Sequence, residues 1–218
     1  MSLDKTSSGL CWLRWSLLGG GLVLGIVLLT LRPPSSPAAK TQPLPVYGQV
    51  QDFTLTNQAG RAVGLNSLRG HVWLADIIFT RCAGPCPRMT AEMSRIQHFF
   101  APNEDVKFIS LTADPGFDVP NVLKRYGERF SADFSRWDFL TGPRDVIYRL
   151  ATKDLLLVVA DVKPGERESP EDLFLHSTKF VLMDGAGRLR GVFDGENPET
   201  MPAILAAVRA LLAERRAL

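Results

Sequence analysis

Two cysteines four positions apart, Cys82 and Cys86, are the residues whose types and spacing most clearly indicate chemistry. The residues between them include Gly84 and Pro85, which let the chain fold back so that the two sulfur atoms can reach each other or one metal ion. Thiolates are soft metal ligands and redox-active groups. The pair therefore predicts either metal binding or thiol-disulfide exchange.

The position of the pair in the sequence strengthens that prediction. Residues 71–80 are nearly all apolar, which predicts a strand buried on both faces, and a helical pattern follows the cysteines. The carboxyl ends of such strands are where α/β proteins place their sites. We expect the helix N-terminus to lower the pKa of Cys86, with help from Arg81 and Arg88.

Three histidines are the other candidate ligands. His71 precedes the predicted strand, at the end opposite the cysteines. His98 lies about 18 Å beyond Cys86 along the predicted helix, so it is not expected to share an ion with the thiols. His176 stands where a polar loop meets a strand, and the residues alone leave open whether its imidazole approaches the sulfurs or is solvated.

A carboxylate, Asp76, precedes Cys82 by six positions on the predicted buried strand. If it lies beneath the sulfur atoms, burial raises its pKa and it can accept a proton during thiol exchange. The alternative is a structural side chain hydrogen-bonded within the sheet.

The elements that must position these residues alternate between strands and helices. Further strands are expected at 106–113, 137–142 and 154–162, hairpins at 51–65 and 176–195, and helices beginning at Pro87 and spanning 119–130, 143–151 and 199–215. This order indicates an α/β protein with a central mixed sheet covered by helices on both faces.

The N-terminal region differs in composition from the rest. Residues 15–31 carry no charge and are long enough to span a bilayer, so we expect a transmembrane anchor after a tail at 1–14. A signal peptide cleaved near Ala39 is the alternative. The proline-rich segment 32–45 predicts an extended linker, and the globular domain is expected at 46–218.

Composition and charge narrow the class of protein further. The chain has 218 residues, of which 45% are hydrophobic and 22% charged, as is usual for globular proteins. From Thr41 onward it carries 21 basic and 22 acidic residues, so no nucleic-acid partner is expected. Three cysteines are too few for a disulfide scaffold, and Cys11, before the apolar run, has no expected role.

Three segments, FTRCAGPCP, LTADPGFDVP and LHSTKFVLMDGAGRL, occur in this order and resemble the signatures of the Sco/SenC family of copper-binding proteins. The resemblance spans about residues 46–212. It implies a thioredoxin-like fold behind an N-terminal membrane anchor. It also implies one copper ion per domain, Cu(I) or Cu(II), bound by Cys82, Cys86 and His176.

The resemblance further implies a role in assembling cytochrome c oxidase. Members deliver copper to the binuclear copper centre or ready its cysteine ligands. The expected partner is the oxidase subunit with that centre or another cuproprotein, and the expected compartment is the periplasm or its equivalent. This role needs no catalytic turnover, so we favour a copper chaperone over an enzyme. The alternative is an extracytoplasmic thiol-disulfide reductase with Cys82 and Cys86 as the redox pair and Asp76 as proton acceptor, as in thioredoxins.

The family's aspartate-proline segment corresponds to Asp114, Pro115 and Asp118. We expect Asp114 to form a turn and Asp118 to cap the following helix, with a part in shaping the rim of the metal site as the alternative. The sequence departs from the family at residues 83–85, Ala-Gly-Pro, where better-known members carry Pro-Asp and an aliphatic residue.

Overall fold

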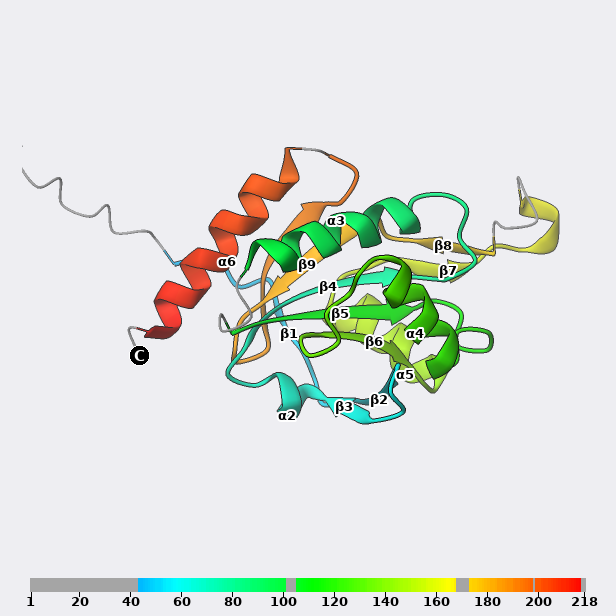
Figure 1. The fold of residues 1–218 in the computed structure, drawn as a ribbon, viewed down its shortest axis with the longest axis horizontal. Helices are drawn as coiled ribbons and strands as arrows, with labels where there is room; N and C mark the ends of the chain where they lie inside the picture. The colour runs from blue at the N-terminus through cyan, green and yellow to red at the C-terminus, as the bar shows by residue number, and fades with distance from the viewer. Residues whose placement is uncertain (1–42, 101–104, 168–172, 198, 217–218) are drawn as a thin grey trace, which may run out of the picture. The chain divides into compact units, whose positions relative to one another are not determined.

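The protein is described by a computed structural model that covers residues 43–100, 105–167, 173–197 and 199–216 (Figure 1). Its strands and helices alternate along most of the chain, as the sequence pattern predicts. In order they are β1 (Gly48–Gln49), β2 (Thr54–Asn57), β3 (Ala62–Gly64), α2 (Leu65–Leu68), β4 (Val72–Ile78), α3 (Cys86–Phe99), β5 (Val106–Thr112), α4 (Pro120–Arg129), β6 (Trp137–Thr141), α5 (Arg144–Arg149), the π-helix η1 (Leu150–Asp154), β7 (Val159–Asp161), the 3-10 helix η2 (Pro164–Glu166), β8 (Phe174–His176), β9 (Lys179–Met183), β10 (Arg188–Asp194) and α6 (Thr200–Arg216).

Most strands join one mixed sheet in the order β1-β10-β9-β4-β5-β6-β2-β3. β4, β5 and β6 run parallel, and β9 pairs with β4 in the antiparallel sense. Every residue of β4 is buried, because β4 lies between two strands and beneath helices. The predicted central mixed sheet and its buried strand are therefore confirmed.

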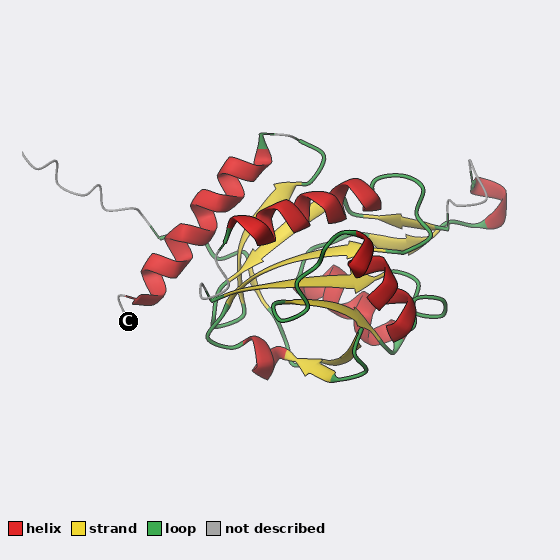
Figure 2. Cartoon of the chain, in the orientation of Figure 1, coloured by secondary structure: helices red, strands yellow, loops and turns green. Residues whose placement is uncertain are grey.

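Helices cover both faces of the sheet. α3 and α4 share one face, since the hydroxyl groups of Thr90 and Tyr126 lie 2.9 Å apart. α6 lies beside α3, with the guanidinium of Arg209 5.0 Å from the ring of Phe99. Figure 2 shows α4 in front of the strands and α5 behind them. The helix that begins with the second cysteine is thus held between two neighbours.

The segment after α5 differs from the prediction. Residues 150–154 continue the helix as η1, so the expected strand 154–162 shortens to β7. Burial and an ion pair explain the difference: Leu150 and Leu155 enter the core, and Arg149 pairs with Asp154 at 2.7 Å. β7 pairs with β8 in a separate two-stranded ribbon. The predicted C-terminal hairpin is confirmed as β9 and β10. His176, the first residue of the predicted hairpin, belongs instead to β8 of the ribbon.

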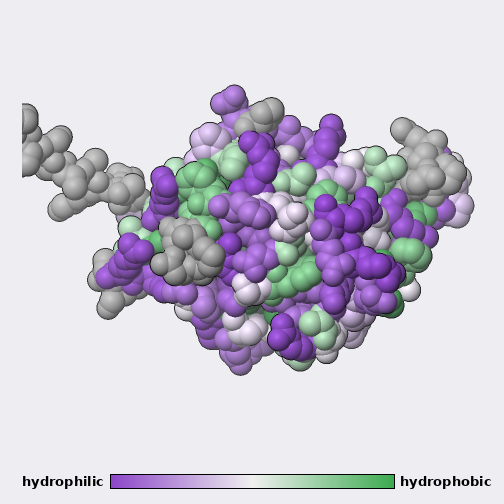
Figure 3. Space-filling view, in the orientation of Figure 1, coloured by the Kyte–Doolittle hydropathy of each residue, from purple (hydrophilic) through white to green (hydrophobic). Residues whose placement is uncertain are grey.

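The hydrophobic core of the described domain is continuous. Its buried members run from Val50 to Leu212 and form one cluster. The face of the molecule in Figure 3 is mostly hydrophilic, with smaller hydrophobic patches between the polar side chains. Residues 42–218 form one compact unit, which is the part of the chain used below for measurements on the domain.

The expected tail at 1–14, the anchor at 15–31 and nearly all of the linker at 32–45 lie outside the described residues. Among the helices of the described ranges, none combines the length and the apolarity that a membrane crossing requires. The anchor and the domain boundaries stay predictions.

Gly127 provides a test of how tightly α4 packs. A Cβ atom there would come within 2.7 Å of Phe134 and 2.8 Å of Phe139. We expect Gly127→Ala to lower the free energy of unfolding by about 1 to 3 kcal/mol in urea titrations, because overpacking outweighs the better helix propensity of alanine. Gly165→Ala, at a position with nothing within 4 Å, is the matched control and should change little. Equal stability of both variants would contradict this account of the packing.

Candidate metal centre

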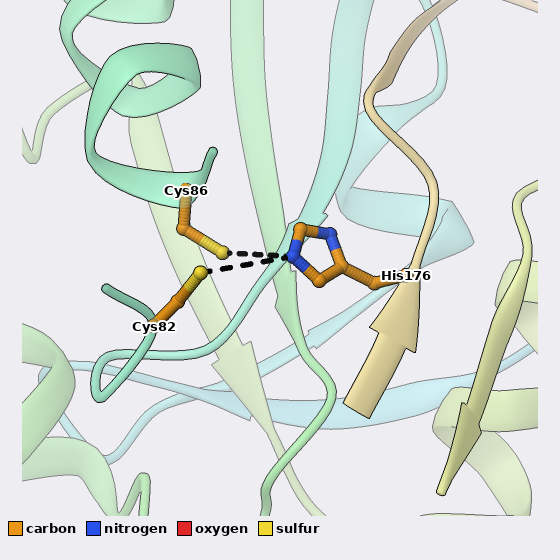
Figure 4. Close-up of side chains that lie close together, drawn as sticks. All are labelled: Cys82, Cys86 and His176. Atoms are coloured by element: carbon orange, nitrogen blue, oxygen red, sulfur yellow. Dashed lines mark hydrogen bonds between the residues drawn. The ribbon is translucent and has the colours of Figure 1, made fainter. Parts of the chain in front are cut away.

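The structure brings Cys82, Cys86 and His176 together, with their ligand atoms all within 4.8 Å of one another. His176 Nε2 lies 3.2 Å from Cys86 Sγ and 3.9 Å from Cys82 Sγ. Figure 4 shows the two thiols and the imidazole pointing toward a common point from three separate segments. Both cysteines are free thiols, so the group offers two sulfur atoms and one nitrogen.

The two cysteines occupy unlike environments. Cys86 is the first residue of α3, one position earlier than the predicted start of the helix, and is fully buried. Its sulfur accepts a hydrogen bond from the backbone N–H of Phe79, 3.4 Å away. Cys82 is half-buried and precedes the exposed residues Ala83 and Gly84. A ligand exchanged with solvent or with a partner protein is therefore reached from the Cys82 side.

His176 reaches the thiols from the β7–β8 ribbon. Its Nδ1 lies 3.2 Å from the backbone oxygen of Ser177, which can only accept, so Nδ1 carries the proton and Nε2 presents its lone pair to the sulfurs. The edge of its ring meets the ring of Phe79, with 5.5 Å between centroids. These two contacts orient the imidazole before any ion arrives.

The acidities of the thiols are opposite to the expectation from the sequence. The hydrogen bond from Cys86 lowers the pKa of Cys82 to about 4 despite partial burial. Burial, and then the neighbouring Cys82, raises the pKa of Cys86 above its ordinary value. The prediction that the helix N-terminus would activate Cys86 was wrong, because the desolvation of a fully buried sulfur outweighs the helix dipole.

The two arginines expected to assist Cys86 have other partners. Arg81 pairs with Asp114 at 2.5 Å and stacks on the ring of Phe117, with 4.1 Å between its guanidinium carbon and the ring centroid. Arg88 pairs with Glu196 at 2.9 Å. Their charges are largely neutralised at the rim of the site.

Asp118 ties the cysteine loop to the neighbouring strand. Its carboxylate accepts hydrogen bonds from the backbone and hydroxyl of Thr80, at 3.1 and 2.5 Å, and from the hydroxyl of Thr112, at 2.5 Å. The expectation that Asp118 caps α4 was wrong, since the cap residue is Val119 and the helix start has no side-chain cap. The carboxylate instead fixes the chain two residues before Cys82, consistent with the alternative of shaping the rim.

The two threonines were missed by the sequence analysis. Thr112 ends β5 opposite Ile78, and Thr80 follows β4 at the same edge of the sheet. The sequence does contain a signal for them. Both threonines stand at the carboxyl ends of predicted neighbouring strands, and the carboxyl ends of parallel strands are where α/β proteins gather their polar site residues.

Asp76 is fully buried on β4, on the side of the sheet that α3 covers. Neither of its carboxylate oxygens has a hydrogen-bond partner among the described residues, although Ser110 lies on the neighbouring strand in register with it. Burial raises the pKa of Asp76 to about 7, against the weaker opposing influences of Ser110 and of His176. The structure does not support the alternative of a carboxylate hydrogen-bonded within the sheet, because neither oxygen has such a partner among the described residues.

The other two histidines lie away from the thiols. His71 stands 3.5 Å from Asp105 at the start of β4, and His98 Nδ1 lies 2.7 Å from the backbone oxygen of Ser94 in its own helix. Neither joins the Cys82–Cys86–His176 group. Met89 and Met93 of α3 are buried core residues.

The donor set constrains which ion fits. Two thiolates and one imidazole form a soft, three-donor site that suits Cu(I) and can also hold Cu(II). Zinc in proteins usually takes four ligands. Within the described ranges, the one group of three or more metal-ligating side chains is this one, and it has no fourth member.

Comparisons with known proteins agree with this geometry. The "SCO1 protein homolog" of Bacillus subtilis is 34% identical over 192 residues, covering 87% of this chain and 95% of its own. A solved SCO1/SenC family lipoprotein from Bacillus anthracis is 32% identical, with a TM-score of 0.67 over 79% of this chain and 99% of its own. The solved structure of BsSco, described as a Sco family cytochrome c oxidase assembly protein with a disulfide switch, is 35% identical, with a TM-score of 0.66 over 78% of this chain and 98% of its own.

Fold and site together define a thioredoxin-like domain with a cluster of two thiols and one imidazole beyond the carboxyl end of its central strand. The SCO1/SenC family model matches residues 43–213. The chain therefore belongs to the SCO1/SenC family.

The acidity of Cys82 yields a first prediction for the site. Thiolate absorbance near 240 nm, followed during a pH titration of the reduced domain, should show one thiol already ionised below pH 6. Cys86→Ala removes the hydrogen-bond donor, so the midpoint for Cys82 should rise toward the ordinary thiol value of about 8.5. Cys86→Ser, which keeps a donor, is the control and should shift the midpoint less. An unmoved midpoint in Cys86→Ala would contradict the assignment.

Asp76 predicts how stability depends on pH. Its folded-state pKa of about 7 exceeds the ordinary 3.8, so the native state holds the proton more tightly than the unfolded state. The free energy of unfolding should then fall as pH rises from about 4 to 7, by about 4 kcal/mol, and level off above. Asp76→Asn should remove that part of the pH dependence in urea titrations at pH 5 and pH 8. The exposed Glu199→Gln should keep it, and parallel curves for the wild type and Asp76→Asn would refute the assignment.

Proposed function

We propose that this domain binds one copper ion through Cys82, Cys86 and His176 and carries it to a copper-requiring partner. The observation that supports the proposal is the convergence of His176 Nε2 on both sulfur atoms, with Nδ1 held by a backbone oxygen. The soft donor set favours copper, and the family signatures in the sequence point to the same ion. Copper here is cargo rather than a resident cofactor.

Delivery proceeds by exchange of ligands. Cu(I) leaves the two thiolates and the imidazole as donor atoms of the partner bind it, without a change of oxidation state, and the freed thiolate of Cys86 takes up a proton from water. The half-buried Cys82 is the ligand that a partner can reach first, whereas the buried Cys86 with its raised pKa is the one most readily protonated. The site can therefore both hold and release the ion.

The partner we propose is the cytochrome c oxidase subunit with the binuclear copper centre, or another cuproprotein. Relatives at about a third identity include one described as an oxidase assembly protein and one described as a lipoprotein. We place the domain outside the cytoplasm, held to the membrane by residues 15–31 through the linker at 32–45. The uncharged run and the five prolines of the linker support that arrangement.

Reduction of a partner's cysteines is the second candidate function. It is favoured by Asp76, a buried carboxyl group with a pKa of about 7 that influences the pKa of Cys86. A group titrating near neutral pH can move a proton in thiol-disulfide exchange. In that reaction the thiolate of Cys82 attacks the partner's disulfide, and Cys86 resolves the mixed disulfide, leaving an oxidised Cys82–Cys86 pair and a reduced partner.

His176 separates the two functions, because copper binding needs the imidazole and disulfide exchange does not. We expect the reduced domain of residues 42–218 to bind one copper and to give a thiolate-to-Cu(II) absorption band. His176→Ala should weaken Cu(II) binding tenfold or more, about 1.4 kcal/mol per tenfold, while retaining most reduction of insulin disulfides. Binding is measured by competition with a chelator, and reduction by insulin turbidity.

His98→Ala is the matched control, because His98 is a histidine of α3 outside the cluster. It should alter neither measurement. If the wild-type domain bound no copper after dialysis, yet reduced insulin equally well with and without His176, the copper proposal would fail and the reductase would replace it.

A further inference from the structure

The chain enters the domain through a buried cluster around Arg190. The guanidinium of Arg190, whose side chain is 3% exposed, donates hydrogen bonds to the backbone oxygens of Leu44, at 2.8 Å, and Pro45, at 3.2 Å. It also pairs with Asp184 at 2.7 Å and with Glu214 at 2.9 Å. Glu214 in turn accepts a hydrogen bond from the backbone N–H of Leu44, 3.3 Å away. The chain that arrives from the predicted linker is therefore fixed to β10 and α6, and Figure 1 shows its start, in blue, beside α6.

This entry point lies at the end of the sheet opposite to the metal centre. Leu189, beside the cluster on β10, is in register with Met183, and Met183 is in register with Trp73 near the start of β4. Cys82 follows the other end of β4, which Ile78 closes. At roughly 3.3 Å per residue, the strand from Trp73 to Ile78 spans about 17 Å. The linker therefore joins the domain at the pole away from the thiols and the imidazole.

Basic residues gather at this pole, which we call the tether pole. It is formed by four chain segments: 69–71, 105–107, 184–190 and 214–216. The backbone N–H of Gly70 donates to the oxygen of Gly185 at 2.8 Å, and Arg215 binds the oxygen of Gly70 and pairs with Asp105, so the segments are in contact. The four segments hold six basic and three acidic residues: Arg69, Lys107, Arg188, Arg190, Arg215 and Arg216 against Asp105, Asp184 and Glu214. They carry an excess of positive charge.

Charges around the metal centre are balanced instead. The ion pairs at that end are those of Arg81 with Asp114, Arg88 with Glu196 and Lys179 with Asp194. Each joins one basic to one acidic side chain. The two ends of the domain therefore differ in charge, and the positive end is the one that receives the linker.

A pocket of about 250 Å³ opens within the tether pole. Arg188, Arg190 and Arg215 line it, and Val72 and Leu211 give it an apolar part. The side chains of Arg188 and Arg215 are 44% and 38% exposed, so a ligand can reach them. A guanidinium group binds phosphate oxygens through paired hydrogen bonds. The pocket thus suits a phosphate group that is attached to an organic chain.

We propose that the tether pole rests on the membrane surface and binds the phosphate groups of anionic lipids, with the metal centre facing away from the bilayer. The inference rests on the membrane attachment in the proposed function. It adds a second contact with the membrane and gives the domain an orientation.

The tether is the reason for assigning a lipid surface as the occupant. Residues 32–43 separate the apolar run 15–31 from the Arg190 cluster, and at about 3.1 Å per residue they reach at most roughly 37 Å. A tether of this length keeps the lipid surface at a high effective concentration near the tether pole. Each basic residue close to an anionic surface adds to the attraction. A modest excess of positive charge is therefore enough to hold this pole down.

The test measures binding of the domain of residues 42–218, without the anchor, to lipid vesicles by cosedimentation. One set of vesicles is phosphatidylcholine alone, and the other contains about 30% phosphatidylglycerol. We expect the domain to bind the anionic vesicles at least tenfold more tightly than the neutral ones at about 50 mM salt. Raising salt to about 500 mM should release it, because the attraction is electrostatic.

Two double variants locate the binding surface. Arg188→Gln with Arg216→Gln removes two exposed charges of the tether pole and should weaken binding to the anionic vesicles at least tenfold. Arg125→Gln with Arg167→Gln is the matched control, because it removes two exposed charges outside the four segments and should stay within twofold of the wild type. Thermal melts must match the wild type. If the first variant does not fold, Arg69→Gln with Arg216→Gln replaces it, since neither residue belongs to the Arg190 cluster.

Cys82 reports the orientation of the bound domain. Its half-buried thiol is modified with N-ethylmaleimide in the presence and absence of saturating anionic vesicles. We expect the two rates to agree within twofold, because the metal centre faces away from the lipid. Strong protection of Cys82 by vesicles would mean that the metal centre lies on the membrane, and the inference would be wrong.

Further outcomes separate the inference from the proposed function. Equal binding to neutral and anionic vesicles, or an equal loss in both double variants, overturns the lipid contact and leaves copper delivery intact. The same holds if calorimetry shows that inorganic phosphate binds the domain while vesicles do not, or if sedimentation shows a dimer that only the tether-pole variant abolishes. If alkaline carbonate extracts the full-length protein from membranes, the membrane attachment in the proposed function fails and the inference fails with it.

Discussion

The contact between His176 Nε2 and Cys86 Sγ, 3.2 Å long and formed across 90 residues of sequence, is the interaction on which the site depends. Cys86 begins α3, so its sulfur is fixed by the packing of that helix on β4. His176 belongs to a separate ribbon, which has to be held against the body by the inner face that includes Val159. The helix therefore fixes one half of the site, and the position of the ribbon decides whether the imidazole completes it.

The Cys82 side is fixed by polar contacts instead. Asp118 binds both hydroxyls and one backbone N–H at the ends of β4 and β5, which anchors Thr80 close to Cys82. Several hydrogen bonds to one buried carboxylate are worth more than a single contact, since loss of any partner leaves a buried polar group unsatisfied. Cys82 itself keeps its exposure beyond this anchored point. The loop is thus rigid at its base and accessible at its tip.

The sequence predicted the elements better than their electrostatics. The apolar run of β4 and the periodicity of α3 placed Cys82 and Cys86 correctly, because burial sets strands and helices through patterns that a sequence displays. The ionisation of Cys86 was predicted wrongly, because the depth of burial of one sulfur depends on how neighbouring elements close over it. The ribbon was predicted only in part, since the leucines at 155–157 lie between η1 and β7 in neither element, and a short apolar run alone does not distinguish a strand from a buried irregular segment. The two threonine partners of Asp118 were missed although both stand at strand ends, because hydrogen bonds from strand ends to a distant carboxylate leave no periodic pattern in the sequence.

The protonation state of Asp76 decides how much negative charge accumulates near the copper site. Cu(I) bound by two thiolates and a neutral imidazole carries a net charge of −1, and an ionised carboxylate in the same low-dielectric interior would add a second negative charge. Burial raises the pKa of Asp76 to about 7, so near neutral pH the group holds its proton much of the time. A thiolate complex above it favours the protonated form further, by like-charge repulsion. The same carboxyl group that could serve a reductase as proton acceptor is thus compatible with copper, because in the copper-bound state it can stay neutral.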